Sequence, residues 1–160
     1  MRLLHIYMVG MLLCLPVASF SQATAPEETK RTQKGLNDLT ASSEDVCRMF
    51  TGAEISKALG VSVRNGAPWG VFGGGCEWAA NEKDAVQIVV VRDKSYWENL
   101  GNVDGGEMLP GLGEAAFVAP WLGAYRAGAL TDRGAVYVMT PRRDLSVDLL
   151  RRAVERLPKP

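Results

Sequence analysis

Apolar and polar residues alternate along several short stretches of the chain, and the clearest of these covers residues 84–92. Val86, Ile88 and Val90 lie on one face of this stretch, while Gln87 and two further valines occupy the other. The pattern predicts a central strand with one face fully buried and the second at least half covered. Further strands are predicted over 76–78, 115–119, 124–130 and 135–139, with a hairpin turn at 131–134 joining the last two.

Helical signals flank these strands. Thr51 and Glu54 form a capping-box sequence at the start of one helix, and Gly60 is a natural left-handed residue at its end. A short helix is expected from Ser95, and an amphipathic C-terminal helix is expected with Asp144 as its cap. The order helix, strands, short helix, strands, helix predicts an α+β domain, in which helices pack on one face of an antiparallel sheet of about five strands.

The start of the chain has the layout of a secretory signal peptide. Arg2 is followed by an apolar run over 3–20 and then by small residues. Cleavage after Ala23 is preferred to cleavage after Ser19. The rival interpretation is an uncleaved anchor, because the run nearly reaches the roughly 20 residues of a membrane-spanning helix, although Pro16 argues against it.

Residues 24–44 are rich in polar residues and poor in large apolar ones. Such a composition predicts a disordered tether, and the alternative is a frayed terminus. The chain is therefore divided into a signal peptide at 1–23, a tether at 24–44 and a single α+β domain at 45–158.

Removal of the signal peptide leaves two cysteines, Cys47 and Cys76. An even pair in an exported chain predicts a disulfide between them. The competing interpretation, a reactive or metal-binding thiol pair, lacks C-x-x-C spacing and a nearby histidine.

The single histidine of the chain, His5, would leave with the signal peptide. Its loss removes Ser-His-Asp and Cys-His catalysis and histidine-ligated zinc, and bonded cysteines supply no thiolate nucleophile. The sequence therefore predicts no catalytic residue, no metal site and no cofactor.

Catalysis by paired carboxylates is not excluded by the loss of histidine and free thiols. A glycosidase needs two carboxylates roughly 5 to 10 Å apart, and Glu77 with Glu114 is the best candidate pair. The competing interpretation is that both are surface carboxylates.

Exposed aromatic residues in loops are the best binding candidates, because large apolar side chains are costly to expose unless something covers them. Either they tuck back onto the domain or they contact a partner. The candidates are Trp69, Phe72, Trp121 and Tyr125.

The chain has 18 basic and 18 acidic residues, so its formal net charge is zero and no nucleic-acid partner is expected. A C-terminal cluster of basic residues is either a patch for an anionic partner or a solvated helix face. Its members are Arg142, Arg143, Arg151, Arg152 and Arg156.

Several short motifs together resemble the small secreted domains of bacterial lipoproteins and sensor ectodomains, best known from actinobacteria. They are Asp45-x-Cys47, Thr51-x-x-Glu54-Ile55, Ala58-Leu59-Gly60, Cys76-x-Trp78 and Pro110-Gly111-Leu112-Gly113-Glu114-Ala115-Ala116-Phe117. The resemblance implies a fold and an extracytoplasmic location, since the functions of these domains are mostly unassigned. The chain departs from the lipoproteins at Cys14, because Leu13 stands where lipid attachment requires a small residue.

The first functional expectation is a non-catalytic periplasmic or secreted binding protein that recognises a protein or cell-envelope component, in one version as an inhibitor or immunity protein. The alternatives are a small envelope enzyme with paired carboxylates, and an assembly accessory protein that contacts the membrane only if its signal is uncleaved.

Overall fold

The computed structural model describes residues 40–70, 74–95, 97 and 105–157. The predicted signal peptide, the tether up to residue 39, and Phe72 lie outside the described residues.

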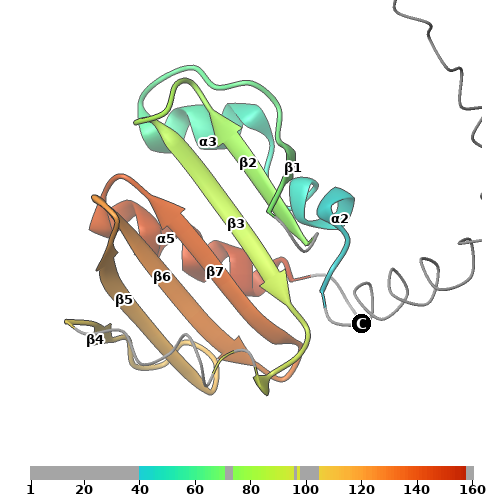
Figure 1. Ribbon diagram of the computed structural model, residues 1–160, viewed down its shortest axis with the longest axis vertical. Coiled ribbons are helices and arrows are strands. Elements are labelled where there is room, and N and C mark those ends of the chain that lie inside the picture. The colour runs from blue at the N-terminus through green and yellow to red at the C-terminus, as the bar shows by residue number, and fades with distance from the viewer. Residues whose placement is uncertain (1–39, 71–73, 96, 98–104, 158–160) are drawn as a thin grey trace, which may run out of the picture.

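One antiparallel sheet carries the fold, and three helices pack on one of its faces (Figure 1). Within the described residues its strand order is β1-β2-β3-β7-β6-β5-β4. The strands are β1 (Ala67–Trp69), β2 (Gly75–Ala79), β3 (Ala85–Val91), β4 (Glu107–Met108), β5 (Ala115–Trp121), β6 (Ala124–Thr131) and β7 (Gly134–Thr140). The helices are α2 (Ser43–Cys47), α3 (Gly52–Leu59) and α5 (Arg143–Glu155).

The α+β class is confirmed, but the prediction of five strands is wrong, because the described sheet has seven. The two extra strands, β1 and β4, lie at its edges and have three and two residues. Their sequences carry no alternating apolar pattern, and β1 contains Pro68, which cannot donate to a ladder. Short edge strands of this kind are formed by pairing with a neighbour rather than by local propensity.

Helix α3 forms as its sequence predicts. The Glu54 amide donates to Thr51 Oγ1 over 3.2 Å, and the Thr51 amide donates to Glu54 Oε2 over 2.8 Å. Both halves of the capping box are therefore present, which satisfies two amides that the first turn would otherwise leave unpaired. The helix ends at Gly60, whose φ of 82° is left-handed.

Helix α5 begins earlier than its predicted cap. Arg142 occupies the N-cap position and Asp144 lies in the first turn, so the prediction of Asp144 as the cap is wrong. The junction is organised by Thr140 instead, whose hydroxyl donates to the Arg142 carbonyl over 2.7 Å. At the other end, the Arg133 guanidinium donates to the Val154 and Leu157 carbonyls, each over 2.8 Å, and a cation is favourable at that end of a helix.

The folded unit starts before the predicted boundary at residue 45. Thr40 forms a β-bridge with Val91, the Ala41 amide donates to the Val90 carbonyl, and Ala41 is buried. Ser42 caps α2 by accepting from the Asp45 amide. Residues 40–44, which composition assigned to the tether, are therefore part of the domain.

The main core lies between the sheet and the helices. Trp78, Val86, Ile88, Val136 and Val138 point from the strands into this layer, and all are fully buried. They contact an apolar stripe on α5 and the buried faces of α2 and α3. The fully buried face predicted for the strand over 84–92 is therefore confirmed.

A disulfide joins Cys47, the last residue of α2, to Cys76 on β2. The two Cα atoms are 5.1 Å apart, and the bond closes a separation of 29 residues. It confirms the predicted pairing and fixes α2 to the sheet. Such bonds persist in oxidising compartments.

Replacing both cysteines, as Cys47→Ala/Cys76→Ala, is expected to lower the free energy of unfolding by about 3 to 4 kcal/mol, because a loop of this length loses less chain entropy on folding when it is closed. Urea unfolding of the oxidised chain and the double variant measures the difference. Dithiothreitol should lower the stability of the native chain to that of the variant and leave the variant unchanged. Equal midpoints with and without dithiothreitol in the native chain would contradict the expectation.

Candidate functional site on the open face of the sheet

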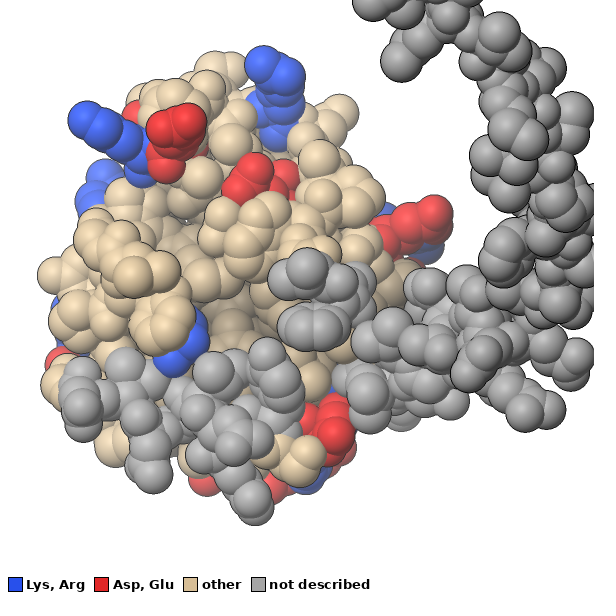
Figure 2. Space-filling model, viewed as in Figure 1, with Lys and Arg blue, Asp and Glu red and all other residues tan. Residues whose placement is uncertain are grey.

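Helices α2, α3 and α5 cover one face of the sheet; the other is called here the open face. In the register of the sheet, Phe117, Gly128, Tyr137 and Val89 lie in one row across its centre. Figure 2 shows that this face is mainly uncharged, with most of the charged side chains near its rim. The central strands are thus apolar on both faces, although the three helices cover only one.

Trp97 covers part of the open face. Its ring centroid lies 5.4 Å from that of Phe117 and 5.9 Å from that of Tyr137. Gly128 makes this cluster possible, since a Cβ there would lie 2.8 Å from Phe117 Cε1 and 2.9 Å from Tyr137 Cδ1. Without a side chain at that position, the two rings close over β6 and Trp97 packs on both.

The tip of the β5–β6 hairpin, formed by Trp121, Leu122 and Gly123, is the most exposed apolar feature among the described residues. The side chain of Leu122 is 91 % exposed and that of Trp121 is 38 % exposed. Leu122 and Gly123 have φ values of 47° and 79°, as in a type I′ turn. Asn or Gly is preferred at the first of these positions, and a leucine there costs about 1 kcal/mol.

Arg126 supports the hairpin tip from β6. Its guanidinium carbon lies 3.9 Å from the centroid of the Trp121 ring and 5.8 Å from that of Phe117. Arg126 is itself buried, with 6 % of its surface exposed. This cation–π contact fixes the Trp121 ring beside the exposed Leu122.

The four aromatic candidates from the sequence do not form one patch. Trp121 lies on the open face, whereas Tyr125 points to the helix-covered face, because their positions alternate along the hairpin. Trp69 is half-buried on β1, five strand positions from β5, which is about 24 Å at 4.8 Å per strand. Phe72 lies outside the described residues.

Sequence reasoning missed Leu122 and Arg126. The sequence signal for Leu122 was its position directly before a glycine, between two stretches of alternating apolar and polar residues. This arrangement indicates a two-residue turn with Leu122 at its tip. Arg126 had no such signal, since its contact with Trp121 depends on the register of the hairpin.

The paired-carboxylate arrangement is not formed by Glu77 and Glu114. Glu77 lies on β2 and Glu114 directly precedes β5, so four strand spacings, about 19 Å, separate their strands. Each also has a structural contact: Gln87 Nε2 donates to Glu77 over 2.6 Å, and Lys94 pairs with Glu114 over 2.7 Å. The separation exceeds the span of a glycosidase pair.

Four of the five clustered arginines have partners within the domain. Arg142 donates to the Ala58 carbonyl, Arg143 pairs with Glu107, and Arg152 and Arg156 both contact Glu54 Oε1, over 3.3 and 2.8 Å. The cluster therefore fixes α5 to α3 and to β4, which accounts for these charges without an anionic partner.

Glu54 is the centre of this ion-pair network. The Arg156 hydrogen bond, together with the Thr51 amide, lowers the pKa of Glu54 from 4.5 to about 2. Both arginines also lie over the Phe50 ring, with guanidinium carbons 5.1 and 4.6 Å from its centroid. The network stabilises the domain, and Glu54 is not poised to exchange protons near neutral pH.

No family model, curated protein or solved structure matches this chain. Among the described residues, no helix is both long and apolar enough to span a membrane. In the same part of the chain, no three His, Cys, Asp or Glu side chains are grouped in a way that could hold a metal ion.

Gly128→Ala is expected to lower the free energy of unfolding by about 1 to 3 kcal/mol, because the added methyl group enters the space of the Phe117 and Tyr137 rings. Urea unfolding measures the change. In a Phe117→Leu background the same substitution should cost less, since one of the two rings is gone. Purely additive costs in this double-mutant cycle would contradict the proposed contact.

The Glu54 network predicts a dependence of stability on pH. Because the folded pKa of about 2 lies below the ordinary 4.5, the contribution is present above pH 4.5 and is lost as pH falls from about 5 toward 2. Glu54→Gln should therefore cost about 1 to 2 kcal/mol at pH 7, allowing for solvent screening, and much less at pH 2.5. Urea unfolding at both pH values tests this, with the exposed Glu155→Gln as control. Equal costs at the two pH values would contradict it.

Proposed function

We propose that the mature chain is an exported, non-catalytic binding protein that recognises a protein partner in the periplasm or outside the cell through its β5–β6 hairpin tip. The observation that carries this proposal is Leu122: a large apolar side chain, 91 % exposed, held in a backbone conformation that favours other residues. A position that costs stability and buries nothing within the domain fits selection for contact with something else.

The neighbours of Leu122 support the same proposal. Tryptophan and arginine are enriched among the residues that dominate binding energy at protein interfaces, and here Arg126 holds the Trp121 ring in place. Because the ring is already ordered, less side-chain entropy is lost when a partner binds.

The shape of the tip favours a concave partner. A two-residue turn that presents one aliphatic side chain beside one aromatic ring fits a cleft better than a flat surface. An inhibitor or immunity protein that inserts this hairpin into the cleft of an exported enzyme is the specific version that we propose. The disulfide between Cys47 and Cys76 suits a domain that works in an oxidising compartment.

Leu122→Asn separates function from stability. Asparagine fits the first position of a type I′ turn, so the variant should gain about 0.5 to 1 kcal/mol of unfolding free energy while it loses the apolar contact. Its affinity for the partner should fall about 30-fold or more, as should that of Trp121→Ala. Partners are captured from the extracytoplasmic fraction of the host, identified by mass spectrometry, and titrated by calorimetry.

Val61→Asn is the matched control, because Val61 is another exposed apolar residue, with the same 38 % exposure as Trp121, in the loop after α3. It should retain the partner. Capture that is equal for all four proteins would overturn the proposal, as would retention of an envelope polymer and no protein.

A further inference from the structure

A recessed surface lies on the β1–β3 half of the open face, away from the hairpin tip. It is a cavity of about 560 Å³ at the end of the β2–β3 hairpin, and is called here the alanine pocket. This volume lies within the range of small-molecule sites. Because it shares no residue with the hairpin tip, an inference about it stands apart from the proposed function.

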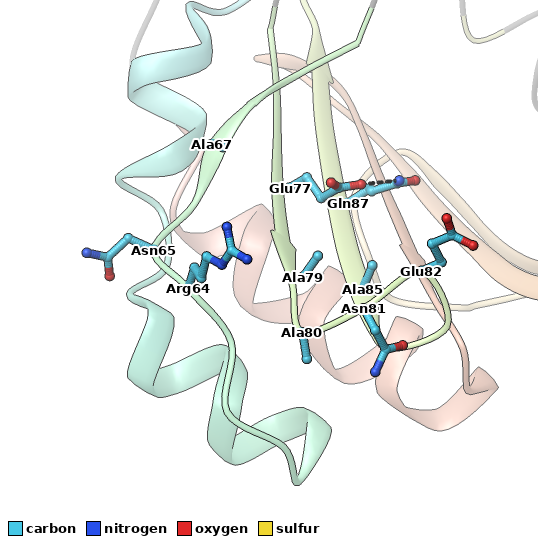
Figure 3. Close-up of a pocket in the computed structure, with 10 residues that line it drawn as sticks. All are labelled: Arg64, Asn65, Ala67, Glu77, Ala79, Ala80, Asn81, Glu82, Ala85 and Gln87. Atoms are coloured by element: carbon cyan, nitrogen blue, oxygen red, sulfur yellow. Dashed lines mark hydrogen bonds between the residues drawn. The ribbon is translucent and has the colours of Figure 1, made fainter.

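The floor of the alanine pocket is made by small side chains. Ala79 on β2 and Ala85 on β3 are directly paired and lie side by side in Figure 3. The next pair on the same face of these strands is Glu77 and Gln87, whose side chains are much longer. Two methyl groups between longer neighbours leave a depression in the sheet, where an apolar part of a ligand can contact the floor.

Opposite charges line the walls. Figure 3 shows the Arg64 guanidinium pointing toward β2, the Glu77 carboxylate pointing from β2 toward Gln87 on β3, and Glu82 in the β2–β3 turn. Among the described residues, Arg64 and Glu82 have neither an ion pair within 4.0 Å nor a side-chain hydrogen bond. The pocket therefore presents the Arg64 cation and the Glu82 anion to solvent.

The Glu77 carboxylate is oriented by one hydrogen bond and can still accept others. Gln87 Nε2 donates to its Oε2 over 2.6 Å, and no described residue donates to its Oε1. The turn that carries Glu82 is also ordered, since Asn81 Oδ1 accepts from the Lys83 and Asp84 amides over 2.9 and 3.0 Å. The protein thus orients the Glu77 carboxylate and the backbone of the turn that carries Glu82.

We propose that the alanine pocket binds a small zwitterion of the amino-acid or dipeptide class. The ligand carboxylate pairs with Arg64, its ammonium group pairs with Glu77 and Glu82, and its aliphatic part contacts Ala79 and Ala85. A ligand that carries both charges can bridge the basic and acidic walls of the pocket, which do not pair with each other. Hydrogen bonds between charged groups are also stronger than those between neutral groups.

The test uses the mature, oxidised chain and L-alanyl-L-alanine as the probe, titrated by calorimetry and by amide chemical shifts. Saturable binding with a Kd below about 1 mM is expected, with shifts centred on 77–87. The N-acetylated dipeptide lacks the ammonium group and the C-terminal amide lacks the carboxylate. Each should bind about tenfold more weakly.

The variants test which residue pairs with each charged end of the dipeptide. In Arg64→Gln the free dipeptide and its amide should bind equally, and in Glu77→Gln the gap between the free and acetylated forms should narrow. Ala85→Leu fills the floor and should abolish binding. The controls are Arg92→Gln and Glu155→Gln, exposed charges outside the pocket, which should bind like the native chain.

Absence of saturable binding to the native chain would overturn the proposal. So would an unchanged preference for the free carboxylate in Arg64→Gln, or unchanged affinity in Ala85→Leu when its unfolding midpoint is native. Loss of partner capture by Leu122→Asn leaves these results untouched, so the two proposals can fail separately.

Discussion

The central strands of this domain are apolar on both faces, whereas its three described helices pack against only one. Apolar surface that none of these three helices buries must be covered in another way. Among the described residues, Trp97 covers part of it by packing on the Phe117 and Tyr137 rings, and Gly128 leaves room for these two rings. Arg126 extends the same layer to the Trp121 ring, where the cover ends and the exposed tip begins.

The second organising feature is the use of charge. The zero net charge and the interspersed acidic and basic residues indicate little about how the charges are used. In the folded chain, however, most of the C-terminal arginines make contacts within the domain. Arg133 satisfies the end of α5, and Arg152 and Arg156 converge on Glu54 at the start of α3. Helices α3 and α5 are thereby joined around one carboxylate. Against this background, an arginine such as Arg64, without an internal partner in the described structure, stands out.

Features encoded within a few residues could be predicted from the sequence: the capping box at Thr51, the end of its helix at Gly60, the alternating strand at 84–92 and the cysteine pair. Those that depend on register could not. Strands β1 and β4 exist only because a neighbour pairs with them, and the contact of Arg126 with Trp121 requires the two strands to be aligned first. Trp121 was found because it is aromatic and near a turn, whereas Tyr125, chosen by the same reasoning, points to the other face.

The shortness of the outer strands limits how this protein can be recognised. One border of the sheet offers three residues interrupted by Pro68, and the other offers two. A guest chain that tried to extend the sheet would find few main-chain donors and acceptors in line, which also discourages fibril growth. Recognition must then depend on side chains. A hairpin residue that faces solvent, such as Leu122, can be exchanged without a change in the architecture of the sheet.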